Sequence, residues 1–175
     1  MAFSSIPIGK KAPQVLNAVI EIPKGSPHKF EYDEELDEIK LDRVLFSSVY
    51  YPTEYGFIPE TRSEDGDHLD VLVIISAPTF PGCVISVRPI SVLNMEDEAG
   101  KDWKIIAVAE KDPRFKEIQT IDDMEAHFKK EIKNFFEVYK QLENKKVTVH
   151  EWRGKEEAYR LIDVARDRYA KENHQ

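Results

Sequence analysis

The order of apolar patterns along the chain constrains the fold more than any other feature of this sequence. Short segments typical of strands occupy the first two thirds, and apolar residues with helical spacing occupy the last third. The strand candidates are residues 15–22, 29–32, 39–43, 69–75, 84–93 and 103–109. Strands followed by helices predict an α+β domain, a small closed sheet flanked by helices.

Two local signals refine the strand prediction. The polar stretch 33–38 has the length of a hairpin turn, so it is expected to join segments 29–32 and 39–43. Pro89 interrupts the candidate at 84–93. Because proline cannot donate a ladder hydrogen bond, it indicates an edge strand or a bulge there.

The last third predicts two helices separated by one more strand, at 147–152. Apolar residues between Ile121 and Leu142 recur at steps of three and four, and Thr120 or Asp122 is suited to cap the start. A second helix is expected from about Lys155, and its apolar stripe consists of Ala158, Leu161, Ile162, Ala165 and Tyr169. No linker or repeat divides the sequence, so we expect a single domain over residues 1–175.

The charge balance excludes several classes of partner. The 175 residues include 25 Lys and Arg against 33 Asp and Glu, a net charge of −8. Such a surface disfavours nucleic acid and anionic membranes, so neither is expected as a partner. The longest purely apolar run, 71–75, is too short to cross a bilayer as a helix, and the N-terminus lacks a secretory signal.

The single cysteine, Cys83, can form no intrachain disulfide, and its apolar neighbours favour packing over a nucleophilic role. A reducing cytoplasm is therefore the expected setting.

The most informative polar stretch is Glu64-Asp-Gly-Asp-His-Leu-Asp70, which runs directly into the apolar segment 71–75. Carboxylates near a core repel one another and resist desolvation, so a cation is expected beside them. Oxygen ligands suit a hard divalent cation, and Gly66 permits the tight turn that lets them converge. The spacing favours a metal site over a solvated acidic turn. It is not an EF-hand, because Asp70 and Ser76 stand at that motif's glycine and glutamate positions.

A second acidic group, Glu96-Asp-Glu-Ala-Gly-Lys-Asp102, connects two strand candidates. By itself it favours an exposed β-turn. It gains functional weight only from the first acidic cluster.

Several cations and phenols lie within apolar alternation: Lys29, Arg43, Tyr51, Tyr55, Lys104, Tyr139 and Lys140. The ordinary interpretation is solvent-facing strands, and core packing for the tyrosines, including Tyr139 on its helical stripe. If these faces line a cavity instead, Lys and Arg would bind a multiply charged oxyanion.

Together, cations beside carboxylate clusters in an acidic protein favour metal-dependent phosphoryl chemistry. Divalent metals neutralise carboxylates and bridge phosphate oxygens, so they allow an acidic site to accept a polyanion. The sequence contains no P-loop, dinucleotide fingerprint, zinc-protease motif or serine-hydrolase elbow.

Seven blocks across nearly the whole chain carry a resemblance to a known family. They are Val19-Ile-Glu-Ile-Pro23, Lys29-Phe-Glu31, Asp42-Arg43, Tyr51-Pro-Thr-Glu-Tyr55-Gly, Asp65-Gly-Asp-His-Leu-Asp70-Val, Asp97-Glu-Ala-Gly-Lys-Asp102-Trp-Lys104 and Phe135-Phe-Glu-Val-Tyr139-Lys140. In this order they resemble the family I soluble inorganic pyrophosphatases of the compact prokaryotic type.

The resemblance implies a five-stranded OB-like closed β-barrel with flanking α-helices. It also implies hydrolysis of pyrophosphate to two phosphates by a metal-activated water without a covalent intermediate. Several Mg²⁺ ions would be needed, with Mn²⁺ a possible substitute, and the chain would assemble as a homohexamer.

The resemblance also assigns roles to individual residues. It implies metal ligation by Asp65, Asp70, Asp102, Asp97, Glu31 and Glu21. It implies phosphate binding by Lys29, Arg43, Tyr139 and Lys140. Asp67 would accept the proton of the attacking water, and Lys104 and Tyr55 would orient carboxylates and nucleophile.

One position departs from the pattern, because His68 stands where the family usually has proline or an acidic residue. A tolerated loop change is the favoured interpretation; a looser loop, a soft ligand or a pH-dependent charge are the alternatives. Other functions also stay open: a hydrolase of other phosphate compounds, a non-catalytic OB-like binding module, or an inactive scaffold.

Overall fold

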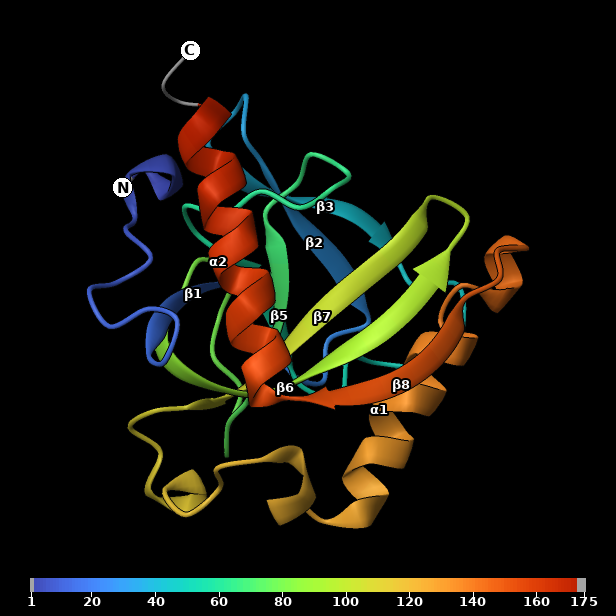
Figure 1. The fold of residues 1–175 in the computed structure, drawn as a ribbon. Coiled ribbons are helices and arrows are strands. Elements are labelled where there is room, and N and C mark those ends of the chain that lie inside the picture. The colour runs from blue at the N-terminus through green and yellow to red at the C-terminus, as the bar shows by residue number, and fades with distance from the viewer. Residues whose placement is uncertain (1, 173–175) are drawn as a thin grey trace.

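The computed structural model describes residues 2–172, which form a β-barrel with one helix on each of two sides (Figure 1). The strands are β1 Leu16–Ile22, β2 His28–Asp33, β3 Glu38–Val44, β4 Glu54–Ile58, β5 Leu69–Ile74, β6 Val84–Asp97, β7 Gly100–Ala109 and β8 Thr148–Gly154. The α-helices are α1 Ala126–Val138 and α2 Lys155–Glu172. None of the helices in this part of the chain is long and apolar enough to span a membrane.

Five strands close the barrel. Their order is β1-β4-β5-β7-β6, and an additional β1–β6 pairing completes the ring, while β8 extends β6 on the outside. Every pairing in the ring is antiparallel except β5–β7. The predicted α+β class and five-stranded OB-like barrel are confirmed.

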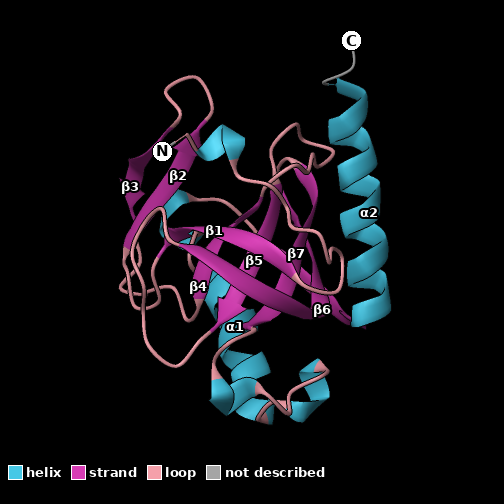
Figure 2. Cartoon of the chain, turned by 90° about the vertical axis from the view of Figure 1, so that its left-hand side faces the viewer, coloured by secondary structure: helices cyan, strands magenta, loops and turns pink. Residues whose placement is uncertain are grey.

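The β2–β3 hairpin forms a separate two-stranded sheet. It lies on the opposite side of the barrel from α2 (Figure 2). The hairpin contacts the barrel through the ring of Tyr32, which stacks on Phe57 of β4 with centroids 5.0 Å apart. One face of the hairpin is therefore turned toward the barrel wall.

Two large apolar clusters, one under each helix, and a small third cluster around Phe57 fill the molecule. Ile132, Phe135 and Phe136 of α1 pack in the first cluster, and Ala158 and Ile162 of α2 pack in the second. Burying a side chain such as Phe136 contributes about 1.5–3 kcal/mol to the free energy of unfolding. Glu156 and Glu157 in the first turn of α2 also complement the helix dipole.

The first helix is shorter than its apolar stripe predicted. The stripe begins in a 3₁₀ turn at Ile121–Asp123 and ends in another at Gln141–Glu143, where Leu142 is exposed. Extended backbone at Met124 separates the first turn from α1. The predicted cap was therefore wrong for α1, because Thr120 precedes the 3₁₀ turn and donates its N–H to Asp123 at 2.8 Å.

The strand pairings revise one strand prediction, confirm a second and show a strand that was not predicted. β6 and β7 pair as far as Asp97 and Gly100, so the turn is much shorter than the predicted 96–102. A register shift between Pro89 and Ser91 confirms the bulge. β4, Glu54–Ile58, was not among the predicted strands. A Cβ on Gly56 would lie 1.9 Å from the Val19 carbonyl oxygen, so glycine is needed for β4 to approach β1.

Candidate active site

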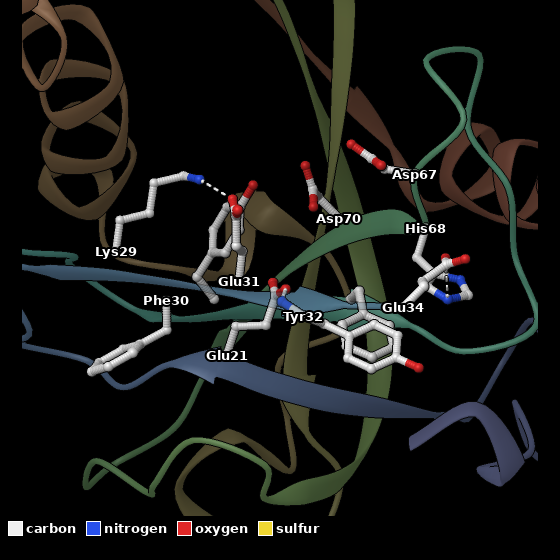
Figure 3. Close-up of a pocket in the computed structure, with 11 residues that line it drawn as sticks. Glu21, Lys29, Phe30, Glu31, Tyr32, Glu34, Asp67, His68 and Asp70 are labelled. Atoms are coloured by element: carbon white, nitrogen blue, oxygen red, sulfur yellow. Dashed lines mark hydrogen bonds and ion pairs between the residues drawn. The ribbon is translucent and has the colours of Figure 1, made fainter. Parts of the chain in front are cut away.

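A cavity of about 280 Å³ lies between the β2–β3 hairpin and the barrel. Six segments supply its polar lining: β1, β2, the β2–β3 turn, β4, the loop before β5, and β5 itself (Figure 3). It brings together six of the predicted site residues: Glu21, Lys29, Glu31, Tyr55, Asp67 and Asp70. Phe30, Tyr32, Glu34, Phe57 and His68 complete the lining.

Lys29 and Glu31 lie on one face of β2 because side chains alternate along a strand. Lys29 Nζ lies 2.9 Å from Glu31 Oε2 and 3.0 Å from Asp42 Oδ2 on β3. Lys29 therefore lines a cavity instead of an open solvent face, whereas Glu31, which lines the same cavity, keeps 41% of its side chain exposed.

The acidic loop, residues 63–67, is closed by its own hydrogen bonds. The Ser63 N–H donates to the Asp67 carbonyl at 2.7 Å, and the Asp67 N–H donates to Asp65 Oδ1 at 3.0 Å. Gly66 has a φ of +94°, a left-handed conformation that favours glycine. Asp65 and Asp70 also line a second cavity of about 60 Å³, together with Asp102.

Lys104 of β7 joins two of the predicted metal ligands. Its Nζ donates to Asp70 Oδ2 at 2.5 Å and to the Tyr55 hydroxyl at 2.8 Å, and lies 2.8 Å from Asp102 Oδ2. The residue is only 3% exposed. Burial opposes its charge, but Asp102 and Asp70 outweigh that effect and raise the pKa of Lys104 well above its usual value.

Three carboxyl groups of the site have raised pKa values. Burial, then the neighbouring Asp70, raises the pKa of Glu21 to about 8. Burial, then Asp65 and Asp70, raises the pKa of Asp67. Burial also raises the pKa of Asp102 despite the nearby Lys104. A cation would relieve this crowding, and a group of oxygen-only donors fits a hard divalent cation such as Mg²⁺.

The donors are engaged with lysines in this arrangement. Asp70 and Asp102 contact Lys104, and Glu31 contacts Lys29. Within residues 2–172, no three His, Cys, Asp or Glu side chains converge into a ready metal site. The oxygen-only chemistry of the donor set fits a hard divalent cation, which would replace these lysines as the partner of the carboxylates.

The other predicted site residues line neither cavity. Lys140 Nζ lies 3.0 Å from Asp97 Oδ2, and its side chain is 12% exposed, so the solvent-facing interpretation of Lys140 was wrong. Tyr139 is buried against Phe135, as its helical stripe indicated, with Lys140 Nζ 5.5 Å from its ring centroid. Arg43 contacts Asp42 and Glu143.

His68 lines the same cavity as Asp67 and Asp70, and its ring belongs to an aromatic stack. Its ring stacks on Phe57 with centroids 4.8 Å apart, and its Nδ1 donates to the Thr61 carbonyl at 2.8 Å. Its Nε2 lies 3.2 Å from Glu34 Oε1, and these two side chains are neighbours in Figure 3. His68, the residue that departs from the family pattern, is therefore part of an aromatic stack.

Sequence reasoning missed Glu34 and Arg62, which contact each other beside this stack. They lie 28 residues apart, and no motif links them. No local signal could have found this pair.

The fold and the site define the chain as an OB-like barrel protein whose cavity combines carboxylates with Lys29, and whose Asp70 in that cavity is paired with the buried Lys104. A sequence model described as inorganic pyrophosphatase matches residues 18–170. The chain belongs to the inorganic pyrophosphatase family.

Relatives in the family are similar over almost their whole length. The chain is 50% identical over 159 residues to an inorganic pyrophosphatase of Methanosarcina mazei, covering 91% of this chain and 94% of the relative. The crystal structure of the inorganic pyrophosphatase from Thermus thermophilus matches with a TM-score of 0.94 and 46% identity, covering 97% and 99% of the two chains. A Helicobacter pylori inorganic pyrophosphatase structure matches with a TM-score of 0.91 and 40% identity, covering 95% and 99%.

Proposed function

We propose that this chain hydrolyses inorganic pyrophosphate to two orthophosphates with Mg²⁺, without a covalent intermediate. The observation that carries the proposal is a set of lysine–carboxylate pairs among the predicted site residues. Lys29 is paired with Glu31, and Lys140 is paired with Asp97. Each pair joins a predicted phosphate-binding cation to a predicted metal ligand.

These pairs suit a substrate that arrives together with divalent cations. The carboxylate of each pair prefers the cation, and the lysine prefers a phosphate oxygen. Each ion pair that opens is replaced by two new ones, so no buried charge is left uncompensated. A neutral or singly charged substrate would not provide this exchange.

The predicted metal ligands are Asp65, Asp70, Asp102, Asp97, Glu31 and Glu21. Bound Mg²⁺ would supply an activated water and neutralise pyrophosphate oxygens, and Mn²⁺ is the expected substitute. The support for this set is the oxygen-only donor chemistry and the crowding of its carboxyl groups, because burial and neighbouring carboxylates raise the pKa of Glu21, Asp67 and Asp102.

The protein side chains have separate roles in the proposed reaction. Asp67 accepts the proton of the attacking water, and its place at the cavity rim supports that role. Lys104 and the Tyr55 hydroxyl hold the Asp70 and Asp102 carboxylates in place. Lys29, Arg43, Tyr139 and Lys140 bind the phosphates and stabilise the leaving group.

A comparison of substrates tests the proposal. Phosphate release is measured from pyrophosphate, tripolyphosphate and ATP, with Mg²⁺ and with EDTA. The proposal predicts fast release from pyrophosphate that EDTA abolishes, and much slower release from the others. Equal rates on all three would favour a general phosphohydrolase, whereas no release beside a positive gel shift would favour a binding module.

The homohexameric assembly and the cytoplasmic location are further proposals, which come from the family resemblance. Exposed Phe46 and Tyr50, adjacent in one surface hollow, support self-association as a homohexamer. Light scattering at micromolar concentration measures the mass directly, and a monomer would contradict this part. The cytoplasm is the proposed setting, with neither nucleic acid nor membrane as partner.

A further inference from the structure

Arg62 lies outside all seven blocks that carry the family resemblance, and none of the proposed roles uses it. It follows β4 and directly precedes the acidic loop 63–67. Its side chain is only 13% exposed. A guanidinium held at such low exposure beside a functional loop requires defined partners.

The guanidinium of Arg62 contacts three separate elements. Nη1 donates to the Gly66 carbonyl in the acidic loop at 2.7 Å and to Glu34 Oε1 at the tip of the β2–β3 hairpin at 2.7 Å. Nε donates to Glu172 Oε2 on α2 at 2.9 Å. One side chain therefore connects the acidic loop to both sides of the molecule.

The backbone of Arg62 is fixed as firmly as its side chain. Its N–H donates to the Ala165 carbonyl at 2.9 Å, and its carbonyl accepts a hydrogen bond from Arg168 Nη1 at 2.8 Å. Its guanidinium also lies 5.6 Å from the centroid of the Tyr169 ring. Because α2 anchors both ends of the residue, the fork that holds Gly66 has little freedom to move.

Glu34 extends the connection to the hairpin. Its carboxylate is shared between Arg62 and His68 Nε2, which lies 3.2 Å away. The hairpin carries Lys29 and Glu31, and the acidic loop carries Asp65 and Asp67. The Arg62–Glu34 contact thus joins the two walls of the cavity.

We propose that Arg62 is a positioning residue that clamps the acidic loop, through the Gly66 carbonyl, to Glu34 and Glu172. The clamp holds Asp65 and Asp67 in place before a divalent cation binds, so less ordering free energy is lost on binding. For the identity of the cation, this inference rests on the proposed function.

The loss of the Arg62 charge and the loss of the clamp are expected to change the affinity for a divalent cation in opposite directions. Arg62 is a cation near Asp67, so removing its charge should by Coulomb's law alone strengthen binding of a divalent cation. Loss of the clamp should weaken binding instead. Arg62→Gln removes the charge, and Arg62→Lys keeps the charge but lacks the planar fork.

The experiment uses the full chain with two readouts. Calorimetric titration measures Mg²⁺ affinity, and hydrogen–deuterium exchange measures the amides of residues 63–67 in metal-free protein. We expect both Arg62→Gln and Arg62→Lys to lose up to about tenfold in Mg²⁺ affinity and to exchange the loop amides faster. The rate of phosphate release at saturating Mg²⁺ should change little. The control is Arg160→Gln, which removes the same charge from an exposed Glu157 pair on α2 and should change neither readout.

Unchanged loop exchange, or unchanged or tighter Mg²⁺ binding in Arg62→Gln, would overturn the clamp. Failure of the clamp and failure of the proposed function are distinguishable. Wild type that releases phosphate while the variants exchange normally refutes the clamp alone. Wild type that releases none while the variants exchange faster refutes the function and supports the clamp.

Discussion

At the scale of single residues, Lys104 is the cation on which the site depends. It is 3% exposed and contacts Asp70, Asp102 and Tyr55. Its positive charge holds together two carboxylates that would otherwise repel each other. The same two carboxylates are predicted metal ligands, so lysine and metal act on one pair of oxygens.

Replacing Lys104 should therefore destabilise the protein in a metal-dependent way. We expect Lys104→Met to lower the free energy of unfolding by roughly 3 kcal/mol in EDTA. This is the lower end for a broken buried pair, because both carboxylates stay about a quarter exposed. Added Mg²⁺ should recover part of the loss. Urea unfolding of Lys104→Met, with exposed Lys101→Met as control, measures both effects, and an equal loss in Mg²⁺ and EDTA would argue against a metal at Asp70 and Asp102.

Asp112 makes a second residue-scale prediction, away from the site. It is 9% exposed and accepts hydrogen bonds from the N–H groups of Ser76 at 2.9 Å and Arg114 at 3.1 Å. Hydrogen bonding from Ser76, then Arg114, lowers the pKa of Asp112 to about 2. Because the folded pKa lies below the unfolded value of about 3.9, ionised Asp112 stabilises the fold above about pH 4. This stabilisation is lost as the pH falls toward 2.

Asp112→Asn should accordingly lower the urea midpoint at pH 7, and the difference from wild type should shrink as the pH falls from 4 to 3. Asp163→Asn, on an exposed face of α2, serves as the control. A difference that stays constant between pH 7 and pH 3 would show that the charge of Asp112 is not what stabilises this turn.

At the scale of elements, the strands were easier to predict than the first helix. The alternation around Lys29 and the apolar run after Asp70 each report a local pattern, and β2 and β5 follow it. The boundary of α1 depends on Asp123, whose carboxylate accepts from the Thr120 N–H and closes a separate turn. Periodicity does not record that interruption. β4 was missed because its glycine is required by the backbone of β1, a strand that is distant in sequence and lies against Gly56.

Gly56 supplies the prediction at this scale. A Cβ there would lie 1.9 Å from the Val19 carbonyl oxygen and 2.9 Å from Ile20 Cα, both backbone atoms of β1. We expect Gly56→Ala to separate β1 from β4 and to lower the free energy of unfolding by more than about 3 kcal/mol. The matched control is Gly154→Ala, where a Cβ meets nothing within 4 Å. Comparable urea midpoints for the two variants would show that β4 can move away from β1 without cost.

At the scale of the whole molecule, the site is an assembly of distant segments. The spacing of Asp65, Asp67 and Asp70 was enough to predict the acidic loop, because these residues are neighbours in sequence. The interpretation of Glu21 and Glu31 as metal ligands came from the family resemblance alone, and it stays a prediction. Arg62, Glu34 and Glu172 could not be connected by any local pattern, because their contacts span 28 and 110 residues.

The closed barrel also bears on domain organisation, which stays a prediction. Because β1 pairs with β6 and α2 packs against the same barrel, segments that are distant in sequence should unfold together. We expect circular dichroism and the fluorescence of Trp103 and Trp152 to give one coincident urea transition. Two separated transitions would contradict a single domain over residues 1–175.

We propose that the acidic loop carries Mg²⁺-dependent hydrolysis of pyrophosphate. The most direct test is phosphate release from pyrophosphate at saturating Mg²⁺ by wild type and by Asp67→Asn, with Asp163→Asn as a control. The Asp67→Asn change keeps the size of the side chain but removes its capacity to accept a proton. Release should therefore fall by about 10²–10⁴-fold, while the control keeps full activity. If folded Asp67→Asn that responds to EDTA retains wild-type release, the acidic loop does not supply the proton acceptor of the reaction.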